Sequence, residues 1–321
     1  AEYDALTGLS QVAGQQSREE LVSNGNGHGC GHNLLGAGSM AAAFAIKHYL
    51  EEKGEGSGKV ILYGCPGEEG AATKAFMARD GVFKECDAAL TWHPGTENQV
   101  TSGTCNTCIQ TEYKFTGVAS HAAGAPEQGR SALDAVELMN VGVNYMREHM
   151  IPEARVHYAV TDTGGDAPNV VQGHAQVIYS VRAPQTDQTY DLVQRVHNIA
   201  RGAALMTETQ VKIQVVSSYA DVLQNKTLDR LVFKHMQELL PLNYTKEELD
   251  YAQTFHKVGD PGDWTMYQGM AVKLLGEKGK HLFQGAMADV CIPPIPLKVG
   301  STDVGDVSWT VPTAWFGSAC F

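Results

Sequence analysis

The sequence contains no apolar run long enough to span a bilayer and no N-terminal signal peptide. It therefore predicts neither an integral membrane protein nor an exported one. Positive charge is also scarce, since 24 Lys and Arg stand against 36 Asp and Glu, a formal net charge of −12. No basic stripe offsets this deficit, which argues against a nucleic acid as the main partner. A small acidic substrate would then need a local positive group, either an arginine or a metal ion.

A disulfide framework is absent as well. The seven cysteines are an odd number spread along the chain, which indicates a protein of the reducing cytoplasm. Cys105 and Cys108 form a CxxC pair, but no second pair and no nearby histidine accompany them. We interpret them as structural and rank a thiol redox protein last among the possible functions. The strand–GxGxxG–acid pattern of a dinucleotide site is missing too.

What is present is a strand and helix rhythm. Residues 34–53 have helical apolar spacing, and residues 59–66 form a short apolar run of the buried parallel-strand type. Residues 71–80 predict a helix and residues 86–94 a second buried strand. This alternation predicts an α/β fold with a mostly parallel sheet.

The rhythm changes near residue 107. Four strands and two helices then follow in the order βαββαβ, the ferredoxin-like plan. The strands are predicted over 108–117, 154–162, 174–184 and 209–218, and the helices over 129–149 and 185–206. The chain thus divides into a first domain, 1–106 and 219–321, and an inserted α+β domain, 107–218. Both ends of the chain resemble cuts from a longer protein.

The stretch GHGCGHN carries the first candidate ligands, Cys30 and His32. A thiolate and an imidazole two residues apart, on a glycine-rich loop just before a helix, can face one metal ion. A flexible turn with an incidental core cysteine is an equally open interpretation of this motif alone.

Two further motifs follow predicted strands. CPGEEG places Glu68 and Glu69 at the end of a strand, where ligands bind in open α/β sheets. Adjacent carboxylates point different ways, so one can bind metal while the other acts as a general base. An isolated pair of acids would be explained more simply by the favourable interaction of negative charge with a helix N-terminus. Because His93 ends the next strand, three elements converge on one sheet edge, which favours a metal centre.

The inserted domain offers weaker candidates. His121 precedes a helix, Asn169 lies in a Gly/Pro turn, and Arg182 ends a strand. An arginine on an apolar strand suits capture of a carboxylate, although a solvated strand-end charge is an equally open interpretation. Asp303 and Asp306 could support a site or cap a helix.

Taken together, the motifs resemble the dinuclear-metal aminoacylase/carboxypeptidase-type amidohydrolases, and within them the aminobenzoyl-glutamate hydrolase group. The motifs that carry the resemblance are AEYDAL, GHGCGHN, CPGEEG, TWHPG, GVASHAAGAPEQGRSALDA, APNVVQGHAQVIYSVRAP and GSTDVGDVSW. The resemblance implies cleavage of the amide bond of an N-acyl amino acid, p-aminobenzoyl-glutamate above all, into p-aminobenzoate and glutamate. It also implies two divalent cations, Mn²⁺ or Zn²⁺.

The resemblance assigns a role to each motif residue. Cys30, His32, Glu69 and His93 would bind the cations, and Glu68 would be the general base.

Other assignments concern the surroundings of the cations and the partners. Asp4 would orient a ligand, while Asn169 and Arg182 would contact the substrate. His121, in an inserted lid and dimerisation domain, would reach the active site of a dimer partner and stabilise the oxyanion. A homodimer, or a complex with a related second subunit, is therefore expected.

The resemblance departs at the C-terminus. The family's last metal-binding histidine follows the segment matched by TAWFGSACF, and this chain ends at Phe321. This departure keeps an alternative open, a catalytically inactive relative that binds acylated amino acids without hydrolysing them.

Overall fold

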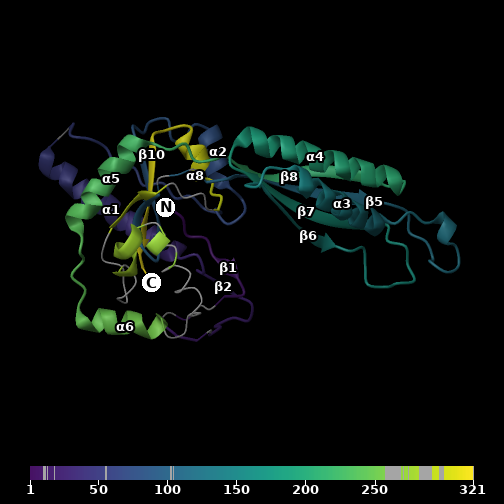
Figure 1. Ribbon diagram of the computed structural model, residues 1–321, viewed down its shortest axis with the longest axis horizontal. Helices are drawn as coiled ribbons and strands as arrows, with labels where there is room; N and C mark the ends of the chain where they lie inside the picture. Colours follow the sequence, from purple (N-terminus) through teal and green to yellow (C-terminus); the bar gives the residue numbers. More distant parts are fainter. Residues whose placement is uncertain are drawn as a thin grey trace.

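The computed structural model describes residues 1–9, 12, 14–17, 19–54, 56–101, 103, 105–256, 269, 271–273, 275–281, 291–295 and 300–320. These residues form an α/β structure with two lobes (Figure 1), which confirms the predicted mixture of helices and strands. Both chain ends lie in the first lobe, and the middle of the chain forms the second lobe.

The first lobe contains a four-stranded sheet. Its strands lie in the order β3-β10-β4-β9. They are β3 (Ala89–Gly95), β4 (Asn98–Thr101), β9 (Cys291–Ile295) and β10 (Thr313–Ala319). The β10–β3 and β4–β9 pairs are parallel, and the β10–β4 pair is antiparallel. The strand predicted over 86–94 is thus confirmed as β3.

The strand predicted over 59–66 is wrong, because these residues carry no regular secondary structure. The N-terminal amine of Ala1 donates to the Tyr63 carbonyl at 2.8 Å, and the Cys65 N–H donates to the Ala1 carbonyl at 2.7 Å. A strand requires a neighbour along its length to complete its hydrogen-bond ladder. The partner in these two bonds is a single residue, which is too short for a ladder.

Helix α1 (His32–Lys53) confirms the helix predicted over 34–53. It begins directly after Gly31, whose φ of 76° is the left-handed conformation that glycine adopts readily. A Cβ atom at residue 31 would lie 2.6 Å from Cγ of Pro94. The start of α1 therefore packs tightly against β3, and this contact brings the GHGCGHN loop to the end of that strand.

The first lobe contains further described elements. Helix α2 (Thr73–Arg79) confirms the helix predicted over 71–80. The rest are β1 (Leu6–Thr7), β2 (Asn26–Gly27), α5 (Lys226–Leu239), α6 (Lys246–His256), η3 (Gly276–His281) and α8 (Val304–Ser308).

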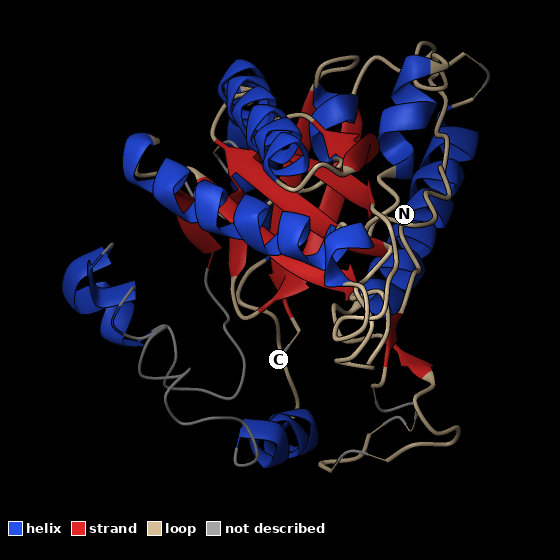
Figure 2. Ribbon diagram, turned by 90° about the vertical axis from the view of Figure 1, so that its right-hand side faces the viewer, coloured by secondary structure: helices blue, strands red, loops and turns tan. Residues whose placement is uncertain are grey.

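The second lobe is an antiparallel sheet with strands in the order β6-β7-β5-β8 and with helices over one face (Figure 2). Its elements follow as β5 (Thr107–Thr116), η1 (Pro126–Gln128), α3 (Ala132–Met146), η2 (Arg147–His149), β6 (Arg155–Asp162), β7 (His174–Ala183), α4 (Thr186–Met206) and β8 (Gln210–Tyr219). Each helix and strand predicted in this stretch is present.

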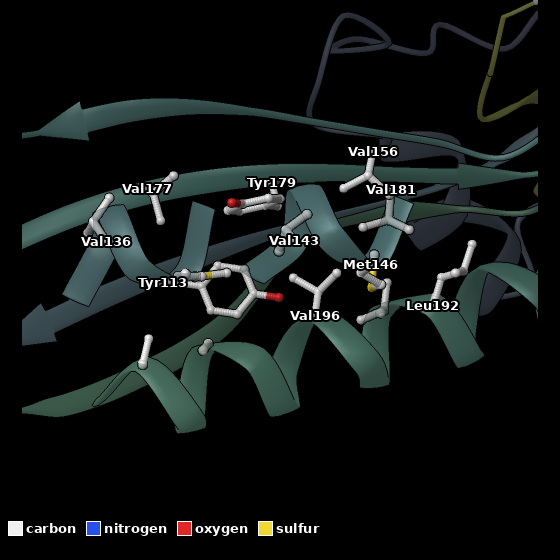
Figure 3. Close-up of a cluster of buried hydrophobic side chains, with 14 of the residues drawn as sticks. Tyr113, Val136, Val143, Met146, Val156, Val177, Tyr179, Val181, Leu192 and Val196 are labelled. Atoms are coloured by element: carbon white, nitrogen blue, oxygen red, sulfur yellow. The ribbon is translucent and has the colours of Figure 1, made fainter. Parts of the chain in front are cut away.

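The second lobe has its own hydrophobic core between sheet and helices (Figure 3). Alternate residues of β7 are buried, as expected for a sheet with one covered face. The rings of Tyr113 and Tyr179 meet edge to face, with centroids 5.7 Å apart. Val136 of α3 and Val196 of α4 are fully buried against this sheet. Within the described residues, no helix is both long and apolar enough to cross a membrane.

Candidate metal centre

Three side chains from two segments meet where α1 begins. Cys30 Sγ lies 3.3 Å from His93 Nε2, and the ring centroids of His32 and His93 are 5.7 Å apart. One possible ligand atom from each of the three lies within 4.8 Å of the other two. The structure thus brings together the thiol and the two imidazoles that the sequence predicted as ligands.

The surroundings of His32 show which ring nitrogen is available. His32 is 1% exposed, and its Nδ1 lies 3.1 Å from Oδ1 of Asp4. A carboxylate can only accept, so Nδ1 carries the proton and Nε2 keeps a lone pair. Among the described residues, the buried Nε2 makes no hydrogen bond, although it lies 3.5 Å from Oε2 of Glu2. Such an imidazole, oriented by a carboxylate and with a free lone pair, fits a bound cation.

Asp4 also organises the neighbouring loop. Its Oδ2 accepts a hydrogen bond of 2.7 Å from the backbone N–H of Glu69. Burial alone would raise the pKa of Asp4, but this bond and the nearby His32 lower it below its ordinary value. One carboxylate therefore links the start of α1 to the EEG motif, as expected for a residue that orients ligands.

Carboxylates crowd the thiol. Partial burial, followed by Glu69, Glu68 and Glu2, raises the pKa of Cys30 to about 12. A thiolate among these acids requires a neighbouring positive charge, and a coordinated cation supplies one. The donor set of sulfur, nitrogen and carboxylate oxygen suits Zn²⁺ or another divalent transition-metal ion.

Glu68 belongs to a second group. One ligand atom from each of Glu2, His32 and Glu68 lies within 4.8 Å of the others. Burial raises the pKa of Glu68 to about 7, and Glu2 and Asp303 add to the shift, while Lys74 and a hydrogen bond with Thr302 oppose it. Among the described residues, Glu69, which the sequence predicted as a ligand, belongs to neither of these two groups, although it lies close enough to Cys30 to raise the pKa of that thiol.

A buried ion network supports this second group. Lys74 Nζ lies 2.6 Å from Glu2 Oε1 and 2.6 Å from Asp303 Oδ1. The backbone N–H of Lys74 also donates to Asp303 Oδ2 at 2.9 Å. All three side chains are at most 5% exposed. Of the two roles proposed for Asp303, the structure therefore favours support of the site. The Asp306 carboxylate accepts instead from the Ala220 N–H at 3.2 Å.

Glu2 and Lys74 were not identified from the sequence. Their partners lie far away along the chain, since Lys74 and Asp303 are 229 positions apart. Glu2 stands within the AEYDAL motif, but no spacing rule marked it as a site residue. A lysine near the start of a helix usually indicates solvent exposure.

The remaining candidates lie in the second lobe. His121 pairs with Val170 in an isolated β-bridge, and the Ala122 N–H donates to the Asn169 carbonyl at 2.9 Å. His121 and Asn169 are therefore close neighbours.

Arg182 belongs to the base of β7, at the junction between the lobes. Its Nε is buried and lacks a hydrogen-bond partner among the described residues. Burial raises the pKa of Tyr219, and the charges of Arg182 and Glu68 act on the same phenol in opposite directions. Tyr219 thus lies within electrostatic reach of both lobes' candidate residues.

Both cysteines of the CxxC pair are buried, which argues against a redox role. Cys108 Sγ lies 3.2 Å from Ser180 Oγ, and burial raises the pKa of Cys105 to about 12. A thiol with so high a pKa is a poor nucleophile at neutral pH. This environment favours the structural interpretation.

Comparison with known proteins identifies the fold family. Residues 1–320 match the family described as Peptidase family M20/M25/M40. The chain belongs to this family. It is accordingly a hydrolase that acts on amide bonds.

Individual relatives agree with this family membership. The chain is 44% identical over 331 aligned residues to one of the subunits of p-aminobenzoyl-glutamate hydrolase of Escherichia coli K12, covering 100% of this chain and 68% of that protein. It is 33% identical to the Xaa-Arg dipeptidase of Mus musculus, covering 71% of this chain and 49% of the dipeptidase. The chain thus spans about half the length of that dipeptidase.

A solved structure shares the fold. The Bacillus subtilis YXEP protein, described as a dinuclear metal binding peptidase from the M20 family, superposes with a TM-score of 0.55 at 16% identity. The superposition covers 99% of this chain and 70% of the other. The M20/M25/M40 fold therefore accounts for nearly the whole chain.

Proposed function

We propose that this chain is a metal-dependent amidohydrolase that cleaves p-aminobenzoyl-glutamate into p-aminobenzoate and glutamate. The observation that carries the proposal is the cluster of Cys30, His32 and His93, in which Asp4 holds His32 Nδ1 and Nε2 makes no hydrogen bond to a described residue. The choice of substrate is supported by the 44% identity to the Escherichia coli relative.

The residues proposed to hold the cations are Cys30, His32, Glu69 and His93. Two divalent cations, Mn²⁺ or Zn²⁺, would supply positive charge that polarises the scissile carbonyl and lowers the pKa of the attacking water. Asp4 keeps the His32 ring in the tautomer that a cation requires.

Glu68 is the proposed general base. A carboxyl group with a pKa of about 7 can accept a proton from water and then return it to the leaving amine. Glu2 and Asp303 raise the pKa of Glu68, and Lys74 lowers it. This network therefore sets how readily Glu68 holds that proton.

The second lobe is proposed to bind the substrate. We propose residues 107–218 as an inserted ferredoxin-like lid, with Asn169 and Arg182 in contact with the glutamate part. The Arg182 guanidinium suits a carboxylate because it can donate two parallel hydrogen bonds. His121 would stabilise the oxyanion in the active site of a partner copy, or of a related second subunit, since the Escherichia coli relative is itself named as one subunit of a hydrolase. A cytoplasmic location is part of the proposal.

Metal analysis combined with an amide-hydrolysis assay tests this function. We expect about two divalent ions per chain and release of p-aminobenzoate from p-aminobenzoyl-glutamate, with loss of both after chelation. One or no ion, with substrate binding but no product, would instead support the inactive relative that binds acylated amino acids. The relatives found by comparison lend that alternative no support.

A further inference from the structure

We propose that two backbone amides lock the His121 ring in a single tautomer, with its proton on Nε2. The ring is then a hydrogen-bond donor and cannot act as a base toward the substrate. This inference deepens the proposed function and rests on it for the identity of the group that receives the hydrogen bond.

The contacts at Nδ1 carry the inference. The backbone N–H groups of Ala123 and Gly124 approach His121 Nδ1 at 3.2 Å and 3.0 Å. A backbone N–H can only donate, so Nδ1 must accept and must keep its lone pair. In a neutral imidazole the proton then resides on Nε2.

The loop, and not the ring, fixes this geometry. The Ala125 N–H donates to the His121 carbonyl at 2.9 Å and closes the turn that presents the two amides. On either side of His121, the Ala122 N–H donates to the Asn169 carbonyl at 2.9 Å and the Val171 N–H to the Ser120 carbonyl at 3.0 Å. Since backbone bonds hold both sides of the turn, the amides are in place before any substrate arrives.

The consequence is a defined chemical preference. Within the described part of the chain, Nε2 of His121 makes no hydrogen bond, and the side chain is exposed. An Nε2–H donor recognises an acceptor, such as a carbonyl oxygen or the oxyanion that develops from it. It cannot accept a hydrogen bond from the N–H of a leaving amine. Proton abstraction is thereby left to Glu68, and His121 serves only to stabilise negative charge.

The test uses NMR of the whole protein with histidine labelled by ¹⁵N. His121 is assigned by its absence in the His121→Gln variant, and its long-range ¹H–¹⁵N pattern identifies the tautomer. We expect one Nε2–H tautomer in the wild type. A His121 ring with its proton on Nδ1, or in an even mixture of tautomers, overturns the proposal without any need for a variant of the loop.

Gly124 provides a matched pair of variants. A Cβ at this position would meet the His121 ring at 3.5 Å, an ordinary contact, so Gly124→Ala keeps the amide donor and should keep the tautomer. Gly124→Pro removes the N–H, and we expect a mixture of tautomers and roughly tenfold lower kcat on p-aminobenzoyl-glutamate. An unchanged tautomer in a folded Gly124→Pro variant, shown by an intact thermal transition, would also refute the lock.

The tautomer and the proposed function fail separately. A protein that does not hydrolyse the substrate can still show the Nε2–H pattern, which would refute the function and retain the lock. Active enzyme with the opposite tautomer would refute the lock and retain the function.

Discussion

At the scale of single residues, the adjacent acids Glu68 and Glu69 have separate surroundings. Both carboxylates raise the pKa of Cys30, but the hydrogen bond of the thiol is with Glu69, whereas Glu68 forms a group with Glu2 and His32. The proposed base, Glu68, and the proposed ligand, Glu69, can therefore be removed one at a time.

The variant Glu68→Ala should keep the cations and lose turnover, because proton transfer by a positioned base contributes roughly 10²–10⁴-fold to the rate. Metal content and kcat on p-aminobenzoyl-glutamate measure the two effects separately. Glu137→Ala, on an exposed position of α3, is the matched control and should leave both unchanged. Near-normal kcat in Glu68→Ala would remove Glu68 from the role of base.

Asp4 should control the affinity for metal. Its two oxygens serve His32 Nδ1 and the Glu69 N–H, and an asparagine offers only one accepting oxygen. We expect Asp4→Asn to bind divalent cations roughly tenfold to a hundredfold more weakly, as is usual when the partner of a ligating histidine is lost. Competition with a chelator gives the affinity, with Asp166→Asn at an exposed position as the control. Equal affinities in the two variants would contradict this role.

At the scale of secondary-structure elements, Lys74 connects three segments. It joins α2 to the N-terminal segment through Glu2 and to the start of α8 through Asp303. Burial alone would lower the pKa of Lys74, but these two carboxylates raise it above its ordinary value, so the buried amine remains charged.

Removal of Lys74 should destabilise the first lobe. Lys74→Met would leave two buried carboxylates without their cation, a change that typically costs about 3–5 kcal/mol. The free energy of unfolding in denaturant measures this, and Lys47→Met, at a solvent-exposed ion pair on α1, should cost less than about 1 kcal/mol. Comparable losses for both variants would show that the buried network contributes no more to the free energy of unfolding than an exposed ion pair.

Helix α8 should give the protein a pH-dependent stability. Burial raises the pKa of Asp306 to about 6 from an ordinary value of 3.8, so the folded state prefers the protonated acid. The ionised carboxylate therefore destabilises the fold fully above about pH 6, and the penalty vanishes as the pH falls below 3.8.

The variant Asp306→Asn keeps an acceptor for the Ala220 N–H and removes the charge. We expect it to be about 1–3 kcal/mol more stable than the wild type at about pH 8 and to gain nothing at a pH below about 3.8. Denaturant unfolding at the two pH values checks this. A gain of the same size at both would mean that ionisation of Asp306 is not the cause.

The sequence predicted helices and strands well wherever they were set by local periodicity. Strand β7 alternates between covered and uncovered faces, and α4 has a clear apolar face, so both could be predicted within their own residues. The run at 59–66 has the same apolar character, yet it is no strand because ladder formation depends on a neighbour elsewhere in the chain. The apolar run also failed to predict burial, since Cys65 is its only buried residue.

The candidate metal cluster was predictable for a different reason. Cys30, His32 and His93 stand next to glycine or proline at the ends of elements, where sequence patterns locate sites in α/β folds. Lys74 gave no such signal, because its burial depends on two acids that approach it from distant parts of the chain.

At the scale of the whole molecule, the second lobe has a core built only from its own residues. The buried cluster runs from Ile109 to Ala204 and adds partly buried Val211 and Ile213. No described residue of the first lobe belongs to this cluster.

Residues 107–219 should therefore fold when expressed alone. We expect a cooperative thermal transition and dispersed amide resonances, since the sheet and both covering helices are contained in that stretch. The longer segment 89–219, which carries β3 and β4 in addition, is the matched comparison and should gain no further cooperativity. A non-cooperative unfolding curve for residues 107–219 would show that the lobe depends on the rest of the chain.

The double attachment of Asp4 has a mechanical consequence. Because one carboxylate holds the imidazole of His32 and the backbone of Glu69 at the same time, a shift of the N-terminal segment carries both along together. The spacing between these two candidate ligands should therefore stay nearly constant when that segment moves.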